Sequence, residues 1–138
     1  MSWIYIVTPF AAWLVAGTLK FAINSLRAKR LAFGLIGYGG LPSNHGAIVS
    51  SMACLIALRE GVAHPAFGVA LTLAFIVILD AASLRRQIGR HAQVLNRLQA
   101  QDRHAAPLRE RMGHTRLEII AGVATGMAVA WLVNEVLG

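Results

Sequence analysis

The chain has 138 residues, which suits a single domain over residues 1–138 and leaves little room for a second. Hydrophobic residues make up 57% of it and charged residues 14%, against about 45–50% and about 25% in soluble domains, so an ordinary soluble protein is excluded. The formal charge is +7, and the basic residues lie between hydrophobic segments. We therefore expect a lipid bilayer and anionic lipid phosphate as partners, and no nucleic acid.

Four hydrophobic segments follow one another, at about residues 3–23, 45–58, 65–84 and 117–137. A membrane-spanning helix needs about 20 apolar residues, so the first, third and fourth are long enough and the second is too short to span alone. No charged residue precedes Lys20, so we expect the first segment to be a retained helix and not a signal peptide. The sequence predicts an all-α membrane bundle of about four helices.

Two polar stretches separate these segments, one with a glycine cluster at 34–40 and one strongly basic at 85–116. The apolar spacing of the second predicts an amphipathic helix to about Gln101, then, after a break at 105–107, a second short helical piece. With four spans, both stretches lie on the same side of the membrane. That side holds every lysine and arginine except Arg59, so the positive-inside rule predicts that it is the cytoplasmic face of a multi-pass inner (cytoplasmic) membrane protein.

The run Gly-Gly-Leu-Pro-Ser-Asn-His-Gly at 39–46 combines a turn with the start of a helix. Ser43 is a suitable N-cap, and the free amides of a helix N-terminus near Asn44, together with a hydroxyl group and His45, form a place for a phosphate. A plain loop with a helix cap explains the same run equally well.

His114 and Glu118 are four residues apart, so in a helix they share one face. The carboxylate can then accept a hydrogen bond from one imidazole nitrogen, which fixes the tautomer and leaves the other nitrogen as a nucleophile. Gly122 and Gly126 continue that face as a stripe of small residues that allows close helix packing. A surface pair at the membrane boundary is the simpler interpretation of the same spacing.

Cationic residues flank two of the hydrophobic segments. Lys20 and Arg27 lie near the end of the first, and Arg85 and Arg86 follow the third, just after Asp80. Guanidinium groups suit the oxygens of a transferring phosphoryl group, and Asp80 can orient either arginine. Each single arginine is equally compatible with a solvated or headgroup-facing charge.

Taken together, these residues resemble the three motifs of the type 2 phosphatidic acid phosphatase and vanadium haloperoxidase superfamily. The motifs are Lys-x6-Arg at 20–27, Pro-Ser-Asn-His at 42–45 and His-x3-Glu-x3-Gly-x3-Gly at 114–126. Three longer runs resemble the divergent, short branch of that superfamily: 39–45, Asp-Ala-Ala-Ser-Leu-Arg-Arg at 80–86 with Leu-Asn at 95–96, and Leu-Arg-Glu-Arg-Met-Gly-His-Thr-Arg-Leu-Glu at 108–118. The resemblance covers nearly the whole chain, in order.

The resemblance implies a phosphatase that uses no metal or other cofactor and hydrolyses the phosphate monoester of a membrane lipid. His114 would attack phosphorus, Glu118 would hold and polarise it, and His45 would protonate the leaving alkoxide and later activate water. The implied phosphate-binding residues are Lys20, Arg27, Ser43, Asn44 and an arginine of the Arg85–Arg86 pair. The candidate substrates are a phosphatidylglycerophosphate-like lipid, ranked first, phosphatidate and a polyprenyl phosphate.

The chain departs from the better-known members at four positions. They have glycine in place of Asn44, proline in place of Ala28, aspartate in place of Glu118 and arginine in place of Leu108; here Arg109 is one residue out of that register. These departures leave open which arginine serves the third motif.

Other interpretations also stay open. Arg85-x5-His91 has the spacing of an arginine and its nucleophile, but Leu95 stands where a carboxylate is needed, so we prefer His114. A non-catalytic subunit that binds anionic headgroups is the alternative function. A third is a small channel or an oligomerising bundle that pairs through Gly122 and Gly126, and a homo-oligomer is left open in each case.

Overall fold

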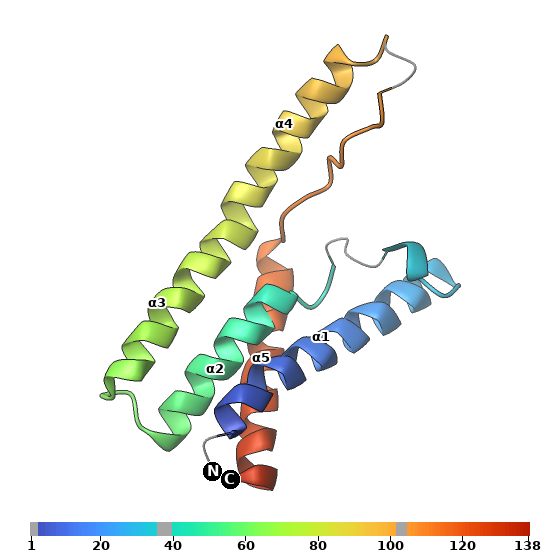
Figure 1. The fold of residues 1–138 in the computed structure, drawn as a ribbon. Helices are drawn as coiled ribbons and strands as arrows, with labels where there is room; N and C mark the ends of the chain where they lie inside the picture. Colours follow the sequence, from blue (N-terminus) through green and yellow to red (C-terminus); the bar gives the residue numbers. More distant parts are fainter. Residues whose placement is uncertain (1–2, 36–39, 102–104) are drawn as a thin grey trace.

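A computed structural model describes residues 3–35, 40–101 and 105–138 (Figure 1). Gly39, which the sequence places in the phosphate loop, lies outside them. The elements are α1 (Ile4–Ala28), a 3-10 turn η1 (Phe33–Leu35), α2 (Asn44–Arg59), α3 (Pro65–Leu79), a π-helical turn η2 (Asp80–Leu84), α4 (Arg85–Leu98) and α5 (Arg116–Leu137). Within the described ranges there is no strand, which confirms the all-α class.

Three helices of the described chain are long and apolar enough to cross a membrane: α1, the continuous helix Pro65–Leu98, and α5. The second segment forms the 16-residue α2, which is not among them. Its place in the bundle explains how so short a helix is accommodated, because α2 packs against α1, α3 and α5 and is covered by them. The bundle is therefore built around α2, which is shorter than each of the three candidate spans.

Two glycines allow the close packing of α5 on α2. A Cβ at Gly122 would lie 2.3 Å from the carbonyl oxygen of Ser43, and one at Gly126 would lie 2.2 Å from that of Ala47. Both distances are far inside van der Waals contact, so any larger residue would push the helices apart. The predicted stripe of small residues thus serves a contact within the chain, which removes the basis for an oligomer that pairs through it.

The third hydrophobic segment continues without a break into the amphipathic helix. α3, η2 and α4 form one helix, Pro65–Leu98, of 34 residues, about 50 Å long at 1.5 Å per residue (Figure 1). At its π-helical turn the amide of Arg85 bonds to the carbonyl of Asp80, five residues earlier. Single π turns inside α-helices are rare and occur frequently at functional sites.

The predicted second short helical piece after the break at 105–107 is wrong. Residues 105–115 have no regular secondary structure and run back along α4 (Figure 1). The Asn96 side chain donates to the Leu108 carbonyl and accepts from the Leu108 amide, both at 2.8 Å. A Cβ at Gly89 would lie 2.3 Å from the Glu110 carbonyl oxygen, so the segment sits directly on the backbone of α4. Bonds to α4 therefore replace the helical bonds that the sequence predicted.

The two ends of the bundle differ in charge. The C-terminal end of α1, the N-terminal ends of α2 and α5, and all of α4 lie toward one end, whereas both chain termini and the α2–α3 turn lie toward the other (Figure 1). The two basic stretches are thus at the same end, and Arg59 is at the opposite one. This arrangement is the one that four helices running alternately up and down require.

Candidate functional site

Three parts of the chain that are distant in sequence meet at the basic end of the bundle: the start of α2, the start of α5 and the π-helical turn. His45 lies in the first turn of α2, and His114 lies two residues before α5. Their ring centroids are 5.7 Å apart, with an angle of 59° between the ring planes. The structure therefore brings together the two histidines to which the family resemblance assigns nucleophile and acid–base roles.

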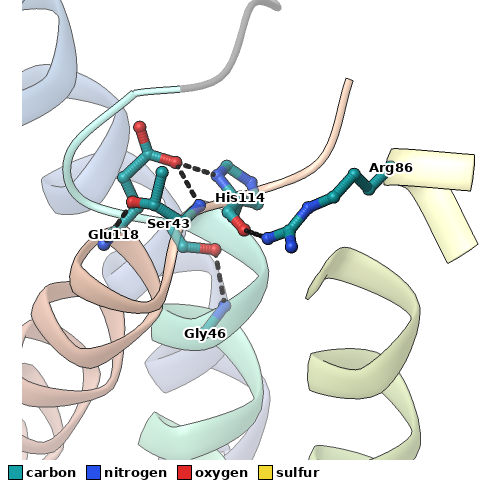
Figure 2. A network of polar contacts seen from close by, with 6 residues as sticks. Ser43, Gly46, Arg86, His114 and Glu118 are labelled. Carbon is teal, nitrogen blue, oxygen red and sulfur yellow. Dashed lines mark hydrogen bonds and ion pairs between the residues drawn. The ribbon is translucent and has the colours of Figure 1, made fainter. Parts of the chain in front are cut away.

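His114 is held at three points, and Figure 2 shows two of them, the contacts with Arg86 and Glu118. Its amide donates to the Ala81 carbonyl in the π-helical turn at 2.9 Å, and its carbonyl accepts from the Arg86 guanidinium at 3.2 Å. Its Nδ1 lies 3.2 Å from a carboxylate oxygen of Glu118. The side chain is 7% exposed, and in the described part of the chain Nε2 has no hydrogen-bond partner. With Nδ1–H donating to the carboxylate, the lone pair of Nε2 is free to attack.

Glu118 is fixed by a capping box at the start of α5. The same oxygen that faces His114 accepts from the Thr115 amide at 2.9 Å, and the Thr115 hydroxyl accepts from the Glu118 amide at 3.2 Å. A carboxylate in the first turn of a helix is also stabilised by the helix dipole. Thr115 is a site residue that the sequence analysis missed, although Thr-x-x-Glu before an apolar run is a recognisable capping signal.

The environment of His114 favours its neutral form. Burial lowers the pKa of His114 below the ordinary value of histidine, the hydrogen bond to Glu118 opposes this, and the positive charge of Lys20 lowers the pKa further. Arg85 acts in the same direction with a smaller effect. A neutral imidazole is the form that can act as a nucleophile.

The start of α2 confirms the predicted cap. Ser43 is fully buried, its hydroxyl accepts from the Gly46 amide at 3.3 Å, and its own amide donates to the Glu118 carbonyl at 2.9 Å (Figure 2). Ser43 thereby joins the first turns of α2 and α5. Next to it, Oδ1 of Asn44 and Nδ1 of His45 are buried and have no hydrogen-bond partner within the described ranges. Since buried polar atoms are nearly always paired, these two suit contact with a ligand.

The four predicted cations occupy different places. Lys20 is partly buried, and its charge and that of Arg85 act on both histidines. Arg85 also pairs with Asp80 at 3.1 Å, so Arg85 is the arginine of the adjacent pair that Asp80 orients. Arg86 instead holds the backbone of His114. Arg27 is exposed, and no contact among the described residues joins it to either histidine.

The rival nucleophile His91 lies elsewhere. It is exposed on α4, and in the described chain no contact joins it to His45, His114 or a carboxylate. The geometry therefore favours His114. The described residues also hold no group of three or more histidine, cysteine, aspartate or glutamate side chains able to bind a metal ion.

Comparisons with known proteins agree with these motifs. The model of a family described as the Divergent PAP2 family matches residues 2–129, which include every residue of the site. The uncharacterized membrane protein YuiD of Bacillus subtilis (strain 168) is 28% identical over an alignment that covers 88% of this chain and 88% of YuiD. No solved structure matches the chain.

Proposed function

The chain belongs to the divergent PAP2 family, and from this premise we propose that it is a metal-independent lipid phosphate monoesterase that forms a phosphohistidine intermediate. The observation that carries the proposal is the pair of histidine rings 5.7 Å apart, one of them oriented by Glu118 with its Nε2 free. A nucleophile, a group that orients it and a second acid–base group are the minimum for covalent phosphoryl transfer in two steps.

In the first step, Nε2 of His114 attacks phosphorus in line with the lipid alcohol. The P–N bond forms while the P–O bond to the alcohol breaks, and His45 gives its proton to the leaving oxygen. Glu118 stabilises the positive charge that develops on the His114 ring. In the second step, His45 takes a proton from water, the resulting hydroxide attacks phosphorus, and the P–N bond breaks to release inorganic phosphate and neutral His114.

The phosphoryl oxygens would be stabilised by groups that already surround the histidines. The amides in the first turn of α2 and the charges of Lys20 and Arg85 supply positive potential there. Arg86 contributes as a positioning residue, because its guanidinium binds the His114 carbonyl. Arg27 would take part only if a bound substrate extended toward it.

A membrane lipid is the substrate that this setting favours. The site lies at the basic end of a bundle with three candidate membrane spans, so an anionic headgroup at the membrane surface can reach it without leaving the bilayer. Phosphatidylglycerophosphate-like lipids, phosphatidate and polyprenyl phosphate all present a phosphate monoester at that depth.

The test is release of phosphate by detergent-purified protein in EDTA, with phosphatidylglycerophosphate, phosphatidate and undecaprenyl phosphate as substrates. His114→Asn keeps an N–H group near the position of Nδ1 for Glu118 but lacks Nε2, so we expect activity to fall by more than about a thousandfold while the protein stays folded. His91→Ala, on the exposed face of α4, is the control and should leave activity unchanged.

Two results would contradict the proposal. If His91→Ala abolished phosphate release while His114→Asn retained it, the nucleophile would be His91 on α4. Binding of these lipids without release from any of them would instead favour the non-catalytic alternative, a membrane subunit that holds anionic headgroups.

A further inference from the structure

A pocket opens beside the candidate site, between α1 and the 3-10 turn. Its volume is about 560 Å³, within the range of about 300–1,000 Å³ that is usual for ligand sites. Toward the middle of α1 its wall is formed by Trp13 and Leu14; nearer the C-terminal end of α1 it is lined by Phe21, with Phe33 of the 3-10 turn opposite. The rings of Phe21 and Phe33 are in contact, with centroids 5.1 Å apart, so this aromatic pair joins the two walls.

The polar groups of the pocket adjoin the histidines. Lys20 and Asn24 line it toward the C-terminal end of α1, and Asn44 lies beside Gly17. Asn44 directly precedes His45, and its buried carboxamide oxygen has no partner in the described chain. Lys20, like Arg85, acts on both histidines through its charge. The pocket thus extends from a cationic, hydrogen-bonding end at the site to an apolar end deeper in the membrane.

The apolar end is open to the surroundings. Trp13 and Leu14 are 50% and 59% exposed although they line the pocket. Trp13 and Leu14 lie near the middle of α1, a candidate membrane span, so the medium around them is hydrocarbon. From Asn24 to Trp13 the helix rises about 16 Å, enough to lie beside a substantial part of a lipid chain.

We propose that this pocket holds the hydrocarbon chain of the substrate, so that a long-chain lipid phosphate enters sideways from the bilayer and presents its phosphate to His114. The inference rests on the proposed function for the identity of the headgroup. It commits to an amphiphile, because a soluble phosphate would leave the aromatic end without a partner. Diacyl and polyprenyl phosphates share the chemistry required, a long apolar chain that ends in a phosphate monoester.

The test compares two leucine-to-tryptophan changes on the same helix. Leu14→Trp fills the pocket, whereas Leu19→Trp places the same side chain on an exposed part of α1 that does not line it. Retention of phosphatidate and of undecaprenyl phosphate is measured by native mass spectrometry in the His114→Asn background, where the lipids are not turned over. Phosphate release is measured separately in the otherwise unaltered protein, with the same lipids and with water-soluble glycerol phosphate.

We expect Leu14→Trp to weaken retention and raise KM for at least one long-chain lipid by about tenfold, the effect of losing about two buried methylene groups. Glycerol phosphate and the Leu19→Trp variant should be unaffected. The lipid whose retention falls identifies the kind of chain. Phe33→Ala, which removes part of the opposite, exposed wall, should weaken retention in the same direction without disturbing the bundle.

The inference would be overturned if Leu14→Trp and Leu19→Trp had equal effects on lipid retention, or if Leu14→Trp reduced phosphate release from glycerol phosphate as much as from the lipids. If phosphate is still released from the lipids, the proposed function stands in either case. Lipid retention that falls in Leu14→Trp, without phosphate release from any lipid, would support the lipid-binding role of the pocket and contradict the proposed phosphatase activity. The two failures are therefore distinguishable.

Discussion

At the scale of single residues, Glu118 performs two tasks with one carboxylate oxygen. That oxygen accepts a hydrogen bond from the amide of Thr115, the N-cap residue of α5. The same oxygen faces Nδ1 of His114 and so orients the ring of the proposed nucleophile. The first task is ordinary helix capping, so the presence of the carboxylate does not by itself demonstrate catalysis. The two tasks can be separated because Thr115 takes part only in the first.

We predict that Glu118→Gln lowers kcat/KM by about a hundredfold, because an amide still accepts from Thr115 but no longer stabilises positive charge on His114. The pH profile provides a second readout. Burial already holds the pKa of His114 below its ordinary value, and Glu118 is the partner that raises it. Loss of the carboxylate should therefore lower this pKa further, so that the acidic limb of the profile, where His114 becomes protonated and inactive, moves to lower pH.

Thr115→Ala is the matched control for this prediction. It removes the hydroxyl that caps α5 and should cost about 1 kcal/mol of unfolding free energy while leaving kcat/KM and the acidic limb unchanged. If Thr115→Ala lowers activity as much as Glu118→Gln does, the contact between Glu118 and His114 is structural.

The sequence was sufficient to predict the residues that a fixed spacing connects. His114 and Glu118 are one helical turn apart, and Ser43 precedes an evident helix start, so local geometry determines both. Arg85 and Arg86 are adjacent, and spacing cannot tell which of them faces the site. The π-helical turn that precedes them changes the phase of the helix, which sends Arg85 to Asp80 and Arg86 to the His114 backbone.

At the scale of elements, the contact between α2 and α5 determines the position of the site, because the Ser43 amide at the start of α2 donates to the Glu118 carbonyl in the first turn of α5. Gly126 lies about two turns further along α5. A Cβ there would lie 2.2 Å from the Ala47 carbonyl oxygen and 2.2 Å from the Ser50 hydroxyl oxygen. Ser50 in turn donates to the Val123 carbonyl at 3.1 Å, so a shift of α5 would also break a polar contact between the helices.

We predict that Gly126→Ala lowers the unfolding free energy by about 1–3 kcal/mol, the usual effect of overpacking a close contact. Gly68→Ala is the control, since a Cβ at Gly68 in α3 meets nothing within 4 Å and alanine is the better helix former. Unfolding measured in detergent should show a loss for the first variant and none for the second. Equal stabilities would mean that α5 does not depend on this close approach.

Hydrophobicity was enough to locate the helices, but not the segment between α4 and α5. The length and apolar character of each segment predicted α1, α3, α5 and the short α2. Residues 105–115 depend instead on tertiary contacts, with Asn96 bonded to Leu108 and Gly89 under Glu110. The Leu-Asn pair at 95–96 is part of one of the motifs in the sequence. No periodic pattern, however, indicates that Asn96 binds the backbone of Leu108, 12 residues away.

At the scale of the whole molecule, the arrangement of helices places the candidate site and nearly all of the cationic charge at one end. The described Lys and Arg residues other than Arg59 belong to the end of α1 and the two residues after it, to α4, or to the segment that leads into α5 and the first residue of α5. Positive charge of this kind is retained on the cytoplasmic side of a membrane, and some of it also lies at the candidate site, so charge alone does not determine the orientation. The orientation matters because it decides from which leaflet the proposed lipid substrate would come.

We predict that the basic end faces the cytoplasm. In a Cys54→Ser background, which removes the single cysteine, Arg90→Cys places a thiol on the exposed face of α4 and Val62→Cys places one in the α2–α3 turn, where Val62 is 70% exposed. A membrane-impermeant maleimide added to intact spheroplasts should label position 62 at once and position 90 only after permeabilisation. The reverse pattern would place the histidines outside, so that the substrate would be a lipid phosphate of the outer leaflet. Labelling of both positions in intact spheroplasts would contradict the membrane-crossing bundle itself, because position 62 precedes the apolar α3 and position 90 follows it, in α4.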